Sequence, residues 1–103
     1  MSTASQPDTT DLGQDIPHLK QMGTVLVASL CFSALKIAGS SPHVKLEVEA
    51  FKQSRSAWDA TRLSNALWFF DPGQPDIAAL VEAIDREAEK AAGLPLPNKR
   101  VRA

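Results

Sequence analysis

The sequence predicts an all-α protein, a small bundle of three helices. Three observations predict it. Apolar residues recur every three to four positions over long stretches. Prolines and glycines gather at a few points between those stretches. A chain of 103 residues, 44% of them apolar, has the size of one domain. We divide it into an acidic arm at 1–15, expected to be disordered, one helical domain at 16–93 and an extended basic tail at 94–103.

The first helix is expected over residues 16–38, where large apolar residues are separated only by small residues or by single polar ones. The glycine, serines and proline of residues 39–42 end it. On a helical wheel almost the whole circumference is apolar, so the helix has to be covered on more than one side. The exception is a narrow polar strip that consists of Ser29, Ser33, Lys36 and Ser40.

The second helix is expected over residues 42–70. Ser41 followed by Pro42 favours its start, because a serine hydroxyl accepts from the free amides of a first turn and proline suits the first helical position. Beyond residue 50 the apolar residues recur at helical spacing. Residues 44–50, in contrast, alternate apolar and charged side chains with the period of two that is typical of a half-buried strand. A short strand at 44–50 in an α+β fold is therefore the alternative.

The third helix follows a turn at residues 71–75, where two prolines and a glycine cannot continue a helix. Its apolar residues form one stripe, and its charged residues face away from that stripe. Gly93 supplies the usual C-terminal stop. The stripe consists of Ile77, Leu80, Val81, Ile84, Ala88 and Ala91.

The core of such a bundle is expected to be thin. Of the 45 apolar residues 15 are alanine, so 30 larger apolar side chains remain for the whole chain. Hydrophobic stabilisation follows buried area at roughly 25 cal/mol per Å², and alanine offers little area. A monomeric core would therefore offset the entropy of folding only narrowly. We expect a homodimer that completes the bundle.

The sequence lacks the residues that several common kinds of functional site require. Cys31 is the only cysteine, so it cannot form a disulfide within the chain, and one cysteine with two histidines is too few for a Cys/His zinc site. The five glycines stand apart, so they form no glycine-rich phosphate loop. Leu30 and Phe32 flank Cys31, which indicates a buried and unreactive thiol. We expect no enzymatic activity, no cofactor and no metal.

The uncharged segment at residues 22–35 is too short to span a membrane. A span requires about 20 predominantly apolar residues, whereas a lysine stands on either side of this segment and several small polar residues interrupt it. The residues before Lys20 carry acidic side chains and no basic one, which is unlike the start of a signal peptide. We therefore expect a cytoplasmic protein without membrane association.

Two groups of apolar side chains form the candidate protein interface, one on the first helix and one at the end of the second helix. The second group is a run of three aromatic residues. Consecutive side chains on a helix point about 100° apart, so at least one of these rings is expected outside the core. Trp58, seven residues after Phe51, is expected inside it. The candidate interface residues are Val25, Leu26, Leu30, Phe32, Trp68, Phe69 and Phe70.

These features favour a small protein that acts by binding another protein, in the manner of a bacterial antiactivator that occludes or sequesters its target. The alternative is a helical protein that associates with nucleic acid through Lys99, Arg100 and Arg102 of the basic tail. The formal net charge of -1 and the acidic third helix argue against this alternative, because binding to phosphates requires a basic surface. A protein is therefore the expected partner.

Overall fold

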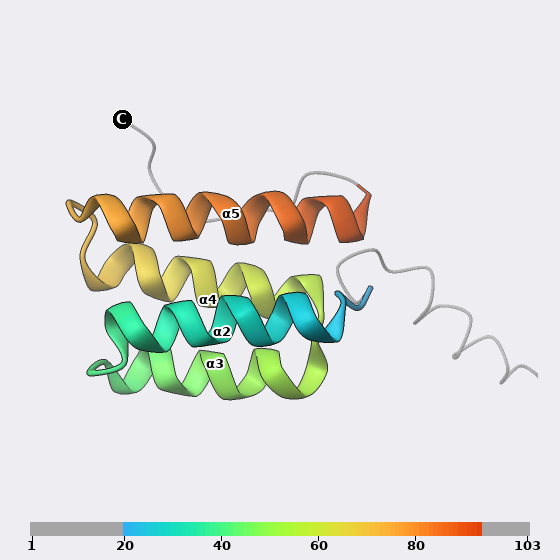
Figure 1. Cartoon of the computed structure of the whole chain (residues 1–103), viewed down its shortest axis with the longest axis horizontal. Helices are drawn as coiled ribbons and strands as arrows, with labels where there is room; N and C mark the ends of the chain where they lie inside the picture. Colours follow the sequence, from blue (N-terminus) through green and yellow to red (C-terminus); the bar gives the residue numbers. More distant parts are fainter. Residues whose placement is uncertain (1–19, 94–103) are drawn as a thin grey trace, which may run out of the picture.

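The computed structural model describes residues 20–93, which form four α-helices packed against one another (Figure 1). The predicted all-α class is confirmed, but the bundle has four helices where three were expected. The predicted arm at 1–15 and the predicted tail at 94–103 lie outside the described residues. The four helices are α2 (Thr24–Ala38), α3 (Pro42–Ser54), α4 (Ala57–Phe70) and α5 (Pro75–Ala92).

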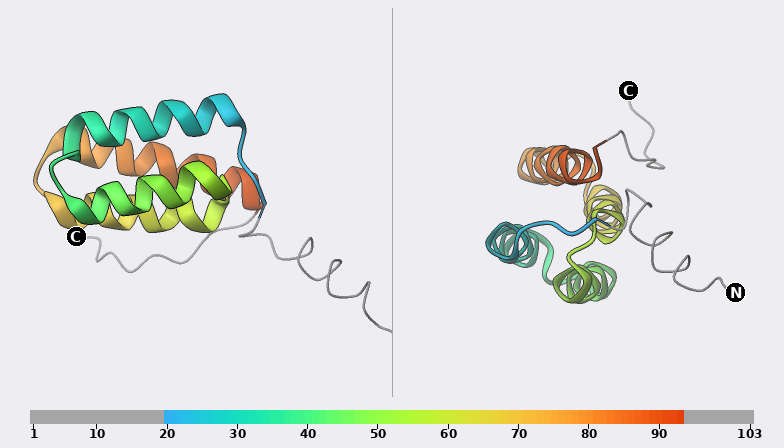
Figure 2. Two further views of the ribbon diagram at one scale, coloured as in Figure 1. Left: turned by 90° about the horizontal axis from the view of Figure 1, so that it is seen from below. Right: turned by 90° about the vertical axis from the view of Figure 1, so that its right-hand side faces the viewer.

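The helices form two layers. Each helix packs against the next one along the chain, and α2 also packs against α5. The right-hand view of Figure 2 shows the helices end-on, with α2 and α3 in one layer and α4 and α5 in the other. Successive helices are antiparallel because the connections between them are short, as in other up-and-down bundles. Helix α2 is thus covered by α3 on one side and by α5 on another.

The helix expected over residues 42–70 is broken at Arg55, which accounts for the additional helix. Arg55 has a φ of 55°, in the left-handed region, and its amide donates to the carbonyl of Phe51. Helix α4 then begins with its own cap, because the hydroxyl of Ser56 accepts from the amide of Asp59. A serine followed three residues later by an acidic residue is an N-terminal capping signal, and this signal in the sequence marks the break.

Residues 44–50 are helical, so the strand alternative is wrong. The buried residues of α3 are Val44, Glu47, Val48 and Phe51, at helical spacings of one, three and four. Leu46, which a strand would place on the same face as Val44, is 67% exposed. The alternating pattern arises because an apolar residue lies on the outer surface of this helix.

The first helix begins at Thr24, later than the expected residue 16. Residues 20–23 are not helical and run beside the connection between α3 and α4, where the amide of Met22 donates to the carbonyl of Arg55 at 2.7 Å. The guanidinium of Arg55 in turn donates to the carbonyl of Met22. This pairing satisfies backbone groups that a continued helix would have satisfied internally. It joins segments that are more than thirty residues apart in the sequence.

The core is closed by the residues of one chain. Helix α2 contributes Val27, Leu30 and smaller side chains to it, whereas the largest fully buried side chains belong to the other three helices. They include Phe51, Leu63, Leu67, Ile77 and Ile84. The additional helix supplies part of the cover for which a second copy was expected. Homodimerisation therefore no longer follows from the core and depends on the surface.

Trp58 lies at the surface with 41% of its area exposed, so its predicted place in the core is wrong. The prediction continued the helical spacing from Phe51 across the break at Arg55. A new helix starts after that break, so the spacing of residues in α3 does not determine which residues of α4 face the core. Helix α4 instead turns Ala57, Ala60 and Leu63 toward the core.

Candidate protein-binding surface

The structure divides the seven predicted interface residues between surface and core. Four of them are exposed: Val25 by 83%, Phe32 by 68%, Phe69 by 62% and Phe70 by 40%. Three are buried or packed against the core, namely Leu26, Leu30 and Trp68. As expected, at least one of the adjacent aromatic residues at the end of α4 lies outside the core. The basic residues of the alternative function, Lys99, Arg100 and Arg102, lie outside the described residues.

The outward side of α2 is an apolar surface interrupted by polar residues. Val25, Ser29, Phe32 and Lys36 follow one another at spacings of four, three and four, so they lie on one side of the helix, and all four are exposed. The predicted polar strip thus shares its side of the helix with two large apolar residues. Because neither α3 nor α5 covers this side, it is available to a partner.

A groove runs between α2 and the C-terminal end of α3. Helix α2 lines it with side chains that are apolar except for one threonine, and the α3 end lines it with two cations. Phe32 belongs both to the outward side of α2 and to the wall of this groove. The lining residues are Thr24, Val27, Ala28, Cys31, Phe32, Leu35, Lys52 and Arg55. Phe32 is the one lining residue that was among the predicted interface residues, and the sequence did not indicate the other seven.

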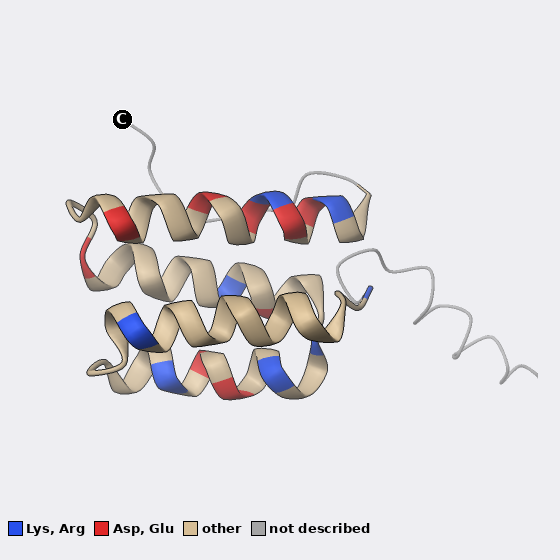
Figure 3. Cartoon of the chain, in the orientation of Figure 1, with Lys and Arg blue, Asp and Glu red and all other residues tan. Residues whose placement is uncertain are grey.

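The two layers of the bundle carry opposite net charge, and Figure 3 shows where their charged residues lie along the helices. Residues 24–55, which include α2 and α3, have four basic and two acidic side chains, a net charge of +2. Residues 56–93, which include α4 and α5, have three basic and seven acidic side chains, a net charge of -4. The near-zero charge of the whole chain therefore conceals a basic layer, which contains the groove, and an acidic layer.

The two cations of the groove differ in their partners. The Nζ of Lys52 lies 3.8 Å from a carboxylate oxygen of Glu49, and both side chains are more than half exposed, so this pair contributes little to stability. The guanidinium of Arg55 donates to neutral oxygens, among them the carbonyl of Met22 at 3.2 Å and the hydroxyl of Thr24 at 3.1 Å. Among the described residues no carboxylate lies within 4 Å of this guanidinium. Arg55 is thus held in place by neutral oxygens and has no carboxylate partner within residues 20–93.

Cys31, which forms part of the groove floor, carries an unreactive thiol. Its Sγ lies 3.9 Å from the carbonyl oxygen of Val48, and 2% of the residue is exposed. Burial raises the pKa of the Cys31 thiol to about 11, although the positive charge of Lys52 opposes this shift. The protonated thiol behaves as a small apolar group at neutral pH, and the buried thiol expected from the sequence is confirmed.

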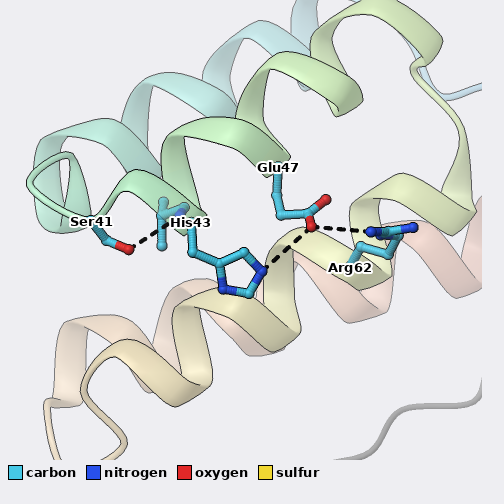
Figure 4. A network of polar contacts seen from close by, with 5 residues as sticks. Ser41, His43, Glu47 and Arg62 are labelled. Atoms are coloured by element: carbon cyan, nitrogen blue, oxygen red, sulfur yellow. Dashed lines mark hydrogen bonds and ion pairs between the residues drawn. The ribbon is translucent and has the colours of Figure 1, made fainter.

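A buried carboxylate joins α3 to α4 (Figure 4). One oxygen of Glu47, whose side chain is 6% exposed, lies 3.3 Å from the Nη2 of Arg62 on α4 and 3.5 Å from the Nε2 of His43, one turn earlier on α3. The hydroxyl of Ser41 at the start of α3 accepts from the amide of Val44. The contacts of Ser41 and His43 lie within α3, whereas the pair of Glu47 and Arg62 joins the basic layer to the acidic layer.

Residues 20–93 contain no group of three or more His, Cys, Asp or Glu side chains placed to bind a metal ion. No helix in the same residues combines the length and the apolar character needed to cross a membrane. No protein-family model, curated protein or solved structure matches the chain. The exposed surface of α2 and the groove beside it are therefore the features of the described residues that bear most directly on function.

Proposed function

We propose that this chain is a non-enzymatic protein-interaction module, a small regulator of bacterial type that binds a target protein and occludes or sequesters it. The surface of α2 supports this proposal. The bundle closes its core within one chain, yet Val25 and Phe32 remain mostly exposed beside a groove lined by apolar side chains. Burying such side chains against a partner is favourable, and aromatic residues beside pockets are frequent anchors of protein interfaces.

The aromatic end of α4 is a second surface in this proposal, with weaker support. Phe69 and Phe70 are exposed next to the turn after α4, and Trp68 is partly buried against the core. These residues occupy one end of the bundle, whereas the α2 surface extends along a helix and borders a groove. We therefore assign the main contact with the target to α2.

A homodimer stays part of the proposal, on different grounds from those that predicted it. The closed core removes the first argument, and the exposed residues Val25 and Phe32 of α2 are the remaining one. We also retain a cytoplasmic location, because a free buried thiol such as Cys31 suits a reducing compartment. Association with nucleic acid stays a prediction, since the residues that carry it lie outside the described part of the chain.

The exchange of Phe32 for aspartate tests the proposed function. Because Phe32 is 68% exposed, the variant is expected to fold, and a charge at this position should lower the recovery of the target from native lysate by about tenfold or more. The matched control is Leu46→Asp, which alters an equally exposed residue, 67%, on α3 outside the groove. Quantitative mass spectrometry of proteins retained by the wild-type chain and by both variants gives the result. Equal recovery by the two variants would contradict the proposal.

A further inference from the structure

We propose that the groove between α2 and α3 binds an amphipathic helix of the target protein, with acidic residues at one end of its apolar stripe. This inference rests on the proposed function and specifies the chemistry of the partner. The groove follows α2 from Thr24 to Leu35, a distance of about 16 Å at the rise of an α-helix. Three turns of a second helix fit along this length and would place apolar residues at spacings of three and four against it.

One end of the groove is apolar. Phe32 and Leu35, which are 68% and 38% exposed, form its wall, and Ala28 and Cys31 lie beside them. The burial of Phe32 and Leu35 supplies the hydrophobic part of the binding free energy, at roughly 25 cal/mol per Å² of apolar surface removed from water. This end therefore favours large aliphatic or aromatic side chains on the bound helix.

The other end of the groove is positively charged. Arg55 contacts Thr24 at this end, and Lys52 lies one turn earlier on α3. The first turn of α2 starts at the same place, with Gly23 at its N-cap, no side chain that caps it and no acidic residue. Its free amides add to the positive potential of the two cations. Carboxylates on the bound helix would compensate the charge of Arg55, for which the described residues provide only neutral partners.

A second copy of this chain fits the groove less well. Helix α2 has no acidic residue and its one charged side chain is Lys36, so α2 of a second copy would bring a cation toward Lys52 and Arg55. The acidic helix α5 of another copy offers carboxylates, but its apolar stripe is buried in its own core, so it has no large exposed apolar side chain to place against the groove. An acidic helix from a different protein meets both the shape and the charge.

An anionic membrane is also a poorer occupant. A helix that lies on a bilayer presents a continuous projecting surface, with its apolar side in the acyl region and basic residues along its length. Here the site is concave, and the two cations that line it, Lys52 and Arg55, come from the C-terminal end of α3, whereas α2 contributes none to it. The geometry favours a single helix over a flat anionic surface.

Two synthetic helical peptides of about fifteen residues, a length at which helices become stable, provide the test with the full-length chain. Both peptides carry the same leucines at spacings of three and four. One has glutamates at one end of this stripe, and the other has lysines there. Fluorescence anisotropy at low ionic strength measures the affinity of each peptide. The acidic peptide is expected to bind about tenfold more tightly than the basic one, because its glutamates attract the two cations of the groove and the lysines of the other peptide repel them. Salt should reduce the difference by screening.

Reversal of one groove charge sharpens the test. Lys52→Glu is expected to weaken binding of the acidic peptide and to strengthen binding of the basic one. Lys45→Glu, the same charge change at an exposed position of α3 outside the groove, should alter neither affinity by more than about twofold. Phe32→Asp should weaken the binding of both peptides, because it removes the apolar contact that they share.

The possible results separate this inference from the proposed function. Equal affinity for both peptides, with loss of both in Phe32→Asp, overturns the acidic preference and supports α2 as the interface. Absence of peptide binding overturns the inference, while capture from lysate decides the proposed function separately. Binding to vesicles of equal parts phosphatidylcholine and phosphatidylglycerol instead of the peptides assigns the groove to a membrane. Self-association that Phe32→Asp abolishes, without peptide binding, assigns it to a second copy.

Discussion

Replacing Leu30 by arginine is expected to unfold the protein, whereas the same replacement of Phe32, two residues further along α2, leaves it folded. Leu30 is 7% exposed and Phe32 is 68% exposed, because residues two positions apart on a helix lie on nearly opposite sides. Removing a buried leucine costs about 2–5 kcal/mol, and a buried guanidinium without a partner adds a further penalty. A small domain has a total stability of about 5–15 kcal/mol, so this loss is severe.

Circular dichroism and urea denaturation of the two variants measure this difference. Ser29→Arg, at another exposed position of the same helix, is the control and should change the free energy of unfolding by less than about 0.5 kcal/mol. If Phe32→Arg unfolds the chain as completely as Leu30→Arg, the outward side of α2 is wrongly assigned and the proposed binding surface is lost with it.

Replacing Arg62 by alanine is expected to lower the free energy of unfolding by about 1–3 kcal/mol at neutral pH. The change leaves the imidazole of His43, whose side chain is 65% exposed, as the one polar side-chain contact of the buried carboxylate of Glu47 within residues 20–93. Loss of one partner from a fully buried pair costs about 3–5 kcal/mol. The effect is smaller here because the side chain of Arg62 is itself 56% exposed and water can reach the site.

Urea denaturation of Arg62→Ala and of the control Arg86→Ala measures the free energy of unfolding of each variant. Arg86 is an exposed arginine on α5, and its removal should cost less than about 0.5 kcal/mol. Equal destabilisation by the two variants would show that the Glu47 network contributes nothing specific to the contact between α3 and α4.

The sequence predicts those elements whose ends carry local signals. Ser41 and Pro42 start α3, and Gly93 ends α5 in a left-handed conformation with a φ of 80°. The break at Arg55 is an exception. Ser56 and Asp59 form a capping signal at the start of α4, but the helical spacing from Phe51 to Trp58 continues across the break, and arginine rarely adopts a left-handed conformation. The late start of α2 was missed for another reason. The pairing of Met22 with Arg55 is a long-range contact that local patterns do not contain.

The candidate surface could be predicted in part. The apolar circumference of the first helix indicates that other helices or a partner must cover it, and it includes Phe32, which the structure leaves exposed. It does not indicate which side the other helices leave open, so Leu30 and Phe32 cannot be told apart from the sequence. Lys52 and Arg55 join the surface only because α3 folds back along α2. Their contribution depends on tertiary packing.

Photo-crosslinking from position 32, in the cells that make the protein, tests most directly whether the α2 surface is the binding site. A benzophenone analogue of phenylalanine replaces Phe32 in one variant and Leu46, as the equally exposed control, in another. We predict discrete adducts with a partner protein from position 32 and none of these from position 46. An adduct of twice the chain mass would identify a second copy as a partner. The same adducts from both positions, or none from position 32, would contradict the assignment of α2 as the binding surface.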